Sequence, residues 1–169
     1  MRGKTQVHEL LYGALLAALA ILIPTAFSGW LQVYIPPFSA TLGSHVPTML
    51  AMLISPQVAA LVGIGSSLGF WFTLGPVVAA RAAVHILVGI MGGVLVRRGY
   101  KDIGALTLTA LPHACGEALV VMLFGFDLYT ALVVVGIGTL LHHAVDSVIT
   151  LAIAGSLVRA GIRLNKPVI

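Results

Sequence analysis

The stretch Pro76–Val96, PVVAARAAVHILVGIMGGVLV, is apolar or small along its whole length except at Arg81 and His85. As a helix, a run of about 21 residues just spans a bilayer core of about 30 Å. A guanidinium keeps its charge at any ordinary pH, and an arginine at the centre of a membrane helix costs about 3 kcal/mol or more. Residues four apart share a helix face, so Arg81 and His85 point the same way, into the bundle. We therefore predict that Arg81 binds an anionic ligand; the alternatives are a structural pair with Glu117 or Asp146, or a side chain that reaches the nearer interface.

The composition of the chain indicates an integral membrane protein. Hydrophobic residues make up 59% of the 169 residues and charged residues 8%, and the mean hydropathy is +1.08. Ordinary soluble domains do not reach these values. Cys115 is the single cysteine, which excludes an intramolecular disulfide and a cysteine-based metal cluster. The formal net charge of +4 comes from basic residues that flank apolar runs, so it indicates topology and not nucleic-acid binding.

Six apolar runs predict six transmembrane helices in one domain that covers residues 1–169. The second run is too short to cross a membrane unless it begins near Phe38 or the preceding loop covers its outer end. Pro56 suits the first turn of the third helix, and Gly75-Pro76 suits the start of the fourth. The expected spans are Leu10–Pro24, His45–Ser55, Pro56–Leu74, Pro76–Val96, Ile103–Phe124 and Thr130–Val158.

The positive charges predict the orientation of these spans. All Lys and Arg residues except Arg81 lie before the first span, between the fourth and fifth, or after the sixth. An even number of spans puts these three places on one side, which the positive-inside rule identifies as the cytoplasm. The predicted fold is therefore an all-α integral membrane bundle of six helices with both termini in the cytoplasm. The residues concerned are Arg2, Lys4, Arg97, Arg98, Lys101, Arg159, Arg163 and Lys166.

The first outer loop, Thr25–Ser44, is broken by Pro and Gly. Ordered loops of about 20 residues are usually functional, so we expect this one to be a lid over an outward pocket. Trp30 and Tyr34 fit an interfacial aromatic belt equally well.

The predicted orientation places several polar residues where they can line one pocket under this lid. Each histidine taken alone can equally well form a hydrogen bond to a neighbouring carbonyl. His113 with Glu117, and His142 with Asp146, are i,i+4 pairs that are also compatible with a proton relay. The predicted pocket residues are Arg81, His85, Glu117, His113 and His45, with His142 as the floor.

The six histidines raise the question of a transition metal. Against a metal, His8 lies outside the membrane, His142 and His143 point to different faces, and Arg81 would repel a cation. We therefore expect no metal.

Two other classes of function are a membrane enzyme and a carrier that acts alone. A membrane enzyme is not expected, because Cys115 lies two residues from His113 and that spacing does not share a helix face. A proton-coupled carrier that acts alone, with Glu117 and Asp146 as its relay, stays open as an alternative.

The chain resembles a known family in its short six-span layout, its long first outer loop and two stretches of sequence. These stretches are Gly13-Ala14-Leu15-Leu16-Ala17-Ala18 and PFSATLGSHVPTMLAMLISPQVAALVGIGSSLG at Pro37–Gly69, which is followed by the Arg81–His85 segment. They resemble the substrate-binding S components of energy-coupling factor (ECF) vitamin transporters, most closely the niacin type and next the pantothenate type. The Met-His start of the cobalt and nickel S components is absent.

This resemblance implies a high-affinity vitamin-binding subunit of a prokaryotic cell membrane, without a cofactor. Its partners would be a transmembrane scaffold protein and two ABC-type ATPases, which would hydrolyse ATP because this chain has no Walker motif. Nicotinate is planar and anionic, so Arg81 would bind its carboxylate. Pantothenate also carries a carboxylate and stays open as the ligand.

Two further sets of residues follow from the resemblance. An aromatic side chain would stack on the nicotinate ring, and Trp71, Phe70 and Trp30 are the candidates. S components use small residues of the first helix to dock on the scaffold, which implies a docking face made of Gly13, Ala14, Ala17 and Ala18.

Overall fold

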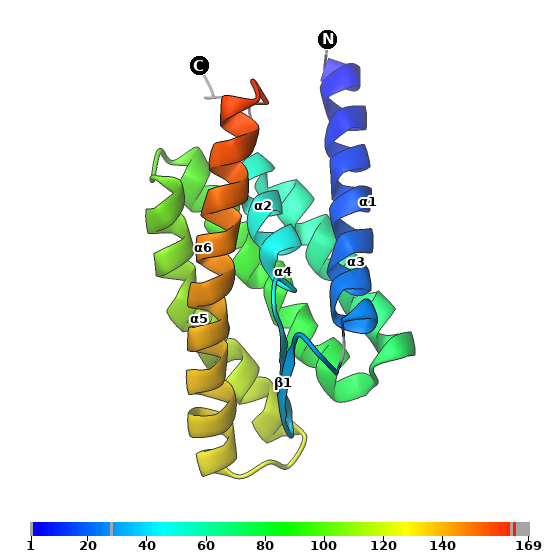
Figure 1. Ribbon diagram of the computed structural model, residues 1–169, viewed down its shortest axis with the longest axis vertical. Coiled ribbons are helices and arrows are strands. Elements are labelled where there is room, and N and C mark those ends of the chain that lie inside the picture. Colours follow the sequence, from blue (N-terminus) through cyan, green and yellow to red (C-terminus); the bar gives the residue numbers. More distant parts are fainter. Residues whose placement is uncertain (1, 28, 163, 165–169) are drawn as a thin grey trace.

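The structure, a computed structural model, is mostly helical and describes residues 2–27, 29–162 and 164. The helices run roughly along the long axis of the molecule, and a β-hairpin lies against the lower half of the bundle in the view of Figure 1. Arg163 and Lys166, two of the basic residues used to predict the orientation, lie outside the described residues. The elements are α1 (Arg2–Ala26), β1 (Gln32–Ile35), β2 (Phe38–Thr41), α2 (Val46–Ile54), α3 (Pro56–Thr73), α4 (Pro76–Arg97), α5 (Asp102–Leu123), the π-helix η1 (Thr130–Ile137) and α6 (Gly138–Arg159).

Four helical segments of the described chain are long and apolar enough to cross a membrane, which agrees with a multi-pass membrane protein. The predicted second span corresponds to α2, whose nine residues reach only about 13 Å as a helix. The number of six spans therefore stays a prediction. The four long segments are Val7–Ala26, Pro76–Arg97, Asp102–Leu123 and Thr130–Arg159.

Both ends of the described chain lie at the same end of the bundle, as does the turn between α4 and α5 (Figure 1). The predicted layout needs this arrangement, because the basic residues concentrate at these three places. The face of the membrane to which this end belongs stays a prediction from those charges.

The turns on either side of α3 form where the sequence predicts them. Ser55 has extended backbone, with φ −166°, and ends α2; its hydroxyl accepts the backbone N–H of Val58 at 3.2 Å and caps α3. Pro56 then occupies the first turn of α3, where its missing N–H costs nothing. Gly75 has a φ of 87°, a conformation that favours glycine, and Pro76 begins α4 directly after it. The predicted starts of the third and fourth helices are confirmed.

Helices α3 and α4 pack with their backbones in close contact. A Cβ built on Gly63 would lie 2.8 Å from the backbone nitrogen of Ile86, and one on Gly93 would lie 2.7 Å from the Cα of Pro56. Glycine at these positions lets the two helices approach closely, as small residues commonly do in membranes. This contact fixes α4, which carries two of the polar residues of the site.

The predicted outer loop contains a β-hairpin, which the sequence did not predict. Strands β1 and β2 are antiparallel, with Gln32 opposite Thr41 and Ile35 opposite Phe38, and Pro36-Pro37 forms the turn. Residues opposite one another share a face of the hairpin. One face is therefore mainly polar and the other apolar, and the polar face covers the pocket described below.

The small residues of α1 divide between two faces. A Cβ on Gly13 would lie 2.6 Å from the side chain of Leu61 on α3, and Ala17 is half-buried. Ala14 and Ala18 are exposed. The predicted docking residues are thus split: Gly13 packs inside this chain, whereas Ala14 and Ala18 are open to a neighbour.

Candidate functional site

A polar pocket lies beneath the hairpin, with walls from α1 to α5. It encloses about 540 Å³, including its open mouth. Sites for small molecules are typically concave, with a few convergent polar groups. Four of the predicted residues line this pocket, namely Arg81, His85, His45 and Glu117, and the hairpin adds Gln32, Ser39 and Thr41.

Arg81 and Glu117 form a buried ion pair in the wall of the pocket. The sequence analysis gave this pair as one of the alternatives for Arg81. The Nη2 and Nε of Arg81 donate to Oε2 of Glu117 at 2.6 and 3.0 Å, and the hydroxyl of Thr139 donates to the same oxygen at 2.8 Å. The side chains of both ions are almost fully buried, so each compensates the other in a site where an unpaired charge is costly. The Nη1 of Arg81 donates to the carbonyl of Pro37 at 3.0 Å, which joins the pocket to the turn of the hairpin.

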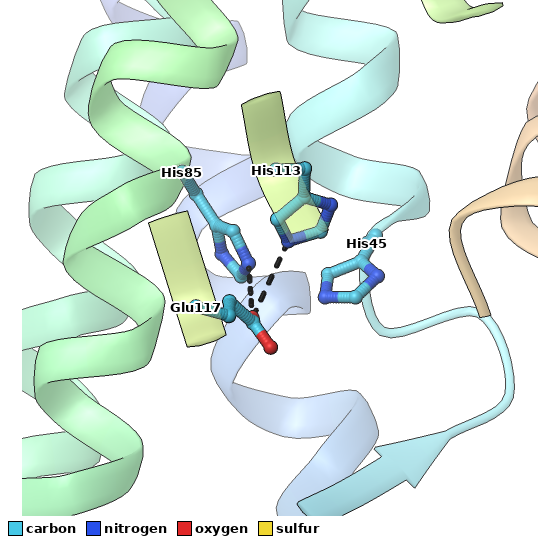
Figure 2. A group of neighbouring side chains, drawn as sticks. All are labelled: His45, His85, His113 and Glu117. Atoms are coloured by element: carbon cyan, nitrogen blue, oxygen red, sulfur yellow. Dashed lines mark hydrogen bonds and ion pairs between the residues drawn. The ribbon is translucent and has the colours of Figure 1, made fainter. Parts of the chain in front are cut away.

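The other oxygen of Glu117 faces two histidines (Figure 2). Its Oε1 lies 3.3 Å from Nε2 of His113 and 3.5 Å from Nε2 of His85. The predicted i,i+4 contact between His113 and Glu117 is confirmed. His113 lies behind Glu117 and does not line the pocket.

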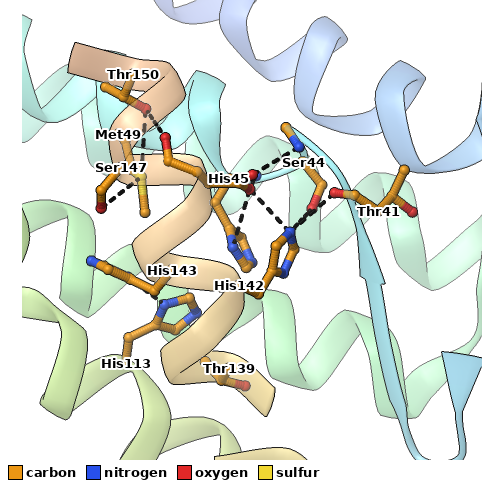
Figure 3. A network of polar contacts seen from close by, with 12 residues as sticks. Thr41, Ser44, His45, Met49, His113, Thr139, His142, His143, Ser147 and Thr150 are labelled. Atoms are coloured by element: carbon orange, nitrogen blue, oxygen red, sulfur yellow. Dashed lines mark hydrogen bonds and ion pairs between the residues drawn. The ribbon is translucent and has the colours of Figure 1, made fainter. Parts of the chain in front are cut away.

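Asp146, on α6, holds the junction between the hairpin and α2 through hydrogen bonds. His142, one turn earlier on α6, points toward Thr41 at the end of β2 (Figure 3). The carboxylate of Asp146 accepts the backbone N–H groups of Gly43 at 2.8 Å and His45 at 2.9 Å, and lies 3.1 Å from Nε2 of His142. The same nitrogen of His142 lies 3.1 Å from the carbonyl of Thr41. The predicted contact between His142 and Asp146 is therefore confirmed, but His142 lies beside the end of β2 and not at the floor of the pocket.

The predicted aromatic residues differ in their exposure and in whether they line the pocket. Trp30 is 77% exposed and Trp71 is 59% exposed, and neither lines the pocket. Phe70 is buried and does line it. Phe38 of the hairpin places its ring centroid 5.5 Å from Cζ of Arg81, within the range of a cation–π contact.

Sequence reasoning did not select the polar residues of the hairpin or His143. Alternation of polar and apolar residues in QVYI and FSAT was the available signal, but each run has only four residues and the two prolines between them indicate a loop. His143 points away from His142, toward α5, where its Nδ1 lies 3.0 Å from Nδ1 of His113.

The chain is similar to the niacin transporter NiaX of Lactococcus lactis subsp. cremoris (strain MG1363). The two are 31% identical over 174 residues, which cover 93% of this chain and 78% of the relative. No family model and no solved structure gives a significant match.

Proposed function

Because the chain belongs to the family of the niacin transporter NiaX, in agreement with its likeness to the niacin-type S components, we propose that it is the vitamin-binding S component of an ECF-type importer. It is a membrane transport protein and not an enzyme. Its proposed ligand is nicotinate, and its proposed place is a prokaryotic cell membrane. The proposed partners are the ECF scaffold protein and two ABC-type ATPases that supply the energy of transport.

The observation that carries this proposal is the buried guanidinium in the wall of the polar pocket. Each terminal nitrogen of Arg81 has two N–H groups, and the contacts with Glu117 and Pro37 engage one on each. The remaining N–H groups can receive a carboxylate in the two-point geometry that arginine favours. His45 and His85 also line the pocket and Phe70 offers an apolar ring, which suits a small, flat anion.

The hairpin is the proposed lid over this ligand. Its turn carbonyl at Pro37 accepts from the same nitrogen, Nη1 of Arg81, that a ligand carboxylate would approach. A carboxylate bound to the remaining N–H groups would therefore lie beside the contact that holds the hairpin turn on the pocket. The polar face of the hairpin, with Gln32, Ser39 and Thr41, covers the pocket, and this supports the proposal that the hairpin is a lid.

The proposed docking face on α1 is reduced to the residues that the fold leaves exposed. Ala14 and Ala18 lie on the outer side of α1, and neither lines the pocket. Small residues let another membrane helix approach closely. We expect Ala14→Trp or Ala18→Trp to leave ligand affinity in detergent unchanged and to abolish both co-purification with the scaffold and ATP-dependent uptake. Full uptake by either variant would remove this face from the proposal.

The direct test is to identify the small molecules released from the purified protein by mass spectrometry and to measure their binding by calorimetry. Nicotinate is the expected molecule, and pantothenate would replace it as the ligand if it were found instead. Arg81→Lys should retain part of the affinity, since lysine keeps the charge but loses the two-point geometry, whereas Arg81→Ala should abolish binding. Uptake that continues without the ATPases and collapses with an uncoupler would favour the proton-coupled carrier.

A further inference from the structure

Three buried histidines and one glutamate converge from separate parts of the fold. His45 precedes α2, His85 is on α4, and His113 and Glu117 are on α5. Each offers a ring nitrogen or carboxylate oxygen, and these four atoms all lie within 4.8 Å of one another. Figure 2 shows the side chains directed toward a common centre. We propose that these four residues bind a first-row transition metal ion, with Zn²⁺ as the best-suited ion.

A chain of hydrogen bonds sets the protonation of His113. The Nε2 of His143 lies 2.8 Å from the carbonyl of Leu106, and a carbonyl only accepts, so Nε2 of His143 carries the hydrogen. In a neutral imidazole the other nitrogen then has none, so Nδ1 of His143 accepts from Nδ1 of His113 across 3.0 Å. The Nε2 of a neutral His113 therefore carries a lone pair. A histidine that binds a metal through one ring nitrogen usually donates a hydrogen bond from the other, as Nδ1 of His113 does here.

This lone pair faces a carboxylate oxygen. Nε2 of His113 lies 3.3 Å from Oε1 of Glu117, and Arg81 and Thr139 already donate to the other oxygen of that carboxylate. Two acceptors at this distance repel one another unless a cation lies between them. Either a proton or a metal ion meets this requirement.

Two further nitrogens favour the metal ion. Within the part of the chain that the structure describes, the buried Nε2 of His85 and Nδ1 of His45 have no hydrogen-bond partner. The carboxylate oxygen Oδ2 of Asp146 lies 3.6 Å from Nδ1 of His45, too far for a hydrogen bond. One proton bridges two acceptors, whereas a zinc ion takes four ligands. Buried polar atoms without partners are rare in folded proteins, so a ligand that engages these imidazoles explains their burial.

Two of the distances between the ligand atoms fit the ion. Tetrahedral zinc with bonds of about 2.0–2.1 Å places its ligand atoms about 3.3–3.4 Å apart. Oε1 of Glu117 lies 3.3 Å from His113 and 3.5 Å from His85, close to two edges of such a tetrahedron. Imidazole with one carboxylate is a donor set that suits zinc and its neighbours in the first row, whereas Ca²⁺ and Mg²⁺ prefer oxygen.

The structure answers two of the three objections that the sequence raised against a metal. Arg81 does not stand as a free cation next to the cluster, because Glu117 pairs with it through Oε2 and leaves Oε1 to the histidines. His142 and His143 need not be ligands. His143 orients His113, and His142 is engaged by the carbonyl of Thr41 beside Asp146.

A second group, His45 with His142 and Asp146, is also close enough to hold an ion. Its carboxylate oxygens already accept two backbone N–H groups, as described above. We therefore assign the metal to the group that contains His85 and His113. This inference goes beyond vitamin binding and does not rest on it.

The test uses the full chain in detergent, freed of metal with a chelator and kept free of nicotinate. Titration with Zn²⁺, with the metal content confirmed by mass spectrometry, should give one ion per chain. His85→Asn and His113→Asn should each lower the affinity at least about 100-fold, and His143→Phe should lower it about 10–100-fold, as for other residues that support a metal ligand. The matched control His8→Asn, on α1 and outside the cluster, should bind Zn²⁺ like the parent protein.

Absence of stoichiometric zinc binding in the parent protein would overturn the proposal and leave a proton between His113 and Glu117. Binding that survives in His85→Asn but is lost in His142→Asn would also overturn it, since the ion would then lie at Asp146. Co²⁺ gives a readout that needs no variant: the parent protein should show the intense visible absorption of tetrahedral cobalt. Only the weak spectrum of a six-coordinate ion would contradict the assigned ligands.

Discussion

The ion pair between Arg81 and Glu117 allows a quantitative prediction on the fold. Removing the guanidinium with Arg81→Met would leave the Thr139 hydroxyl as the remaining donor to Oε2 of Glu117 among the described residues, in a site where both ions are nearly fully buried. Breaking a buried pair from one side costs about 3–5 kcal/mol. For a chain of this length that corresponds to a fall in melting temperature of roughly 6–20 °C. Glu117→Gln should cost a similar amount, because it leaves the guanidinium with the carbonyl of Pro37.

The double variant Arg81→Met/Glu117→Gln separates this explanation from simple loss of packing. Replacing both members of a buried pair by uncharged residues is often nearly neutral. The double variant should therefore be more stable than either single variant, with a coupling energy of about 2 kcal/mol or more. The assay is thermal unfolding of the four proteins in one detergent, without nicotinate and with a chelator. Additive losses, or an Arg81→Met protein as stable as the parent, would refute the reasoning.

Three further predictions concern the hairpin and α1. Asp146→Ala should lower the free energy of unfolding by about 3 kcal/mol, since one buried and one part-buried backbone N–H group lose a charged acceptor; an unchanged melting temperature would show that the carboxylate does not hold the hairpin. Tyr34→Cys in a Cys115→Ser background should react with a thiol probe more slowly when nicotinate is bound, and equal rates would mean that the hairpin is not a lid. Ala17→Leu should lower the melting temperature because it disturbs the packing of α1 on α3, whereas Ala18→Trp should not. If Ala18→Trp lowered the melting temperature and Ala17→Leu did not, Ala18 and not Ala17 would face α3.

Most of the helical architecture could be predicted because its signals are local. Apolar length predicts the long helices, and Ser55-Pro56 and Gly75-Pro76 mark their starts. The convergence of Arg81 with Glu117 was also accessible, because a charge in a membrane helix has to face a partner within the bundle.

The remaining features depend on contacts between distant segments. The alternation of polar and apolar residues in each strand of the hairpin covers only four residues, which is too short to distinguish a strand from a loop. Exposed Trp71 and buried Phe70 are neighbours on α3, and in a membrane protein apolar residues suit both the lipid side and the protein side of a helix. The division of Gly13 from Ala14 depends on where α3 packs, since small residues repeat on more than one face of α1.

The same limit applies to the histidines. The i,i+4 spacing predicted that His113 meets Glu117, and the predicted depths placed His45, His85 and His113 in one pocket. Neither gave the distances at which these three imidazoles meet. The contact between His113 and His143 likewise joins α5 to α6. Only the packing of these helices brings the imidazoles together.

The central claim is that the pocket beneath the hairpin selects an anionic vitamin through Arg81. Calorimetric titration of the purified protein with nicotinate and with nicotinamide tests it most directly, because the two differ at the carboxylate. Losing a charge-assisted hydrogen bond costs about 1.5–3 kcal/mol, so nicotinamide should bind at least about tenfold more weakly than nicotinate. Equal affinities for the two compounds, or no binding of nicotinate by the folded protein, would contradict the account.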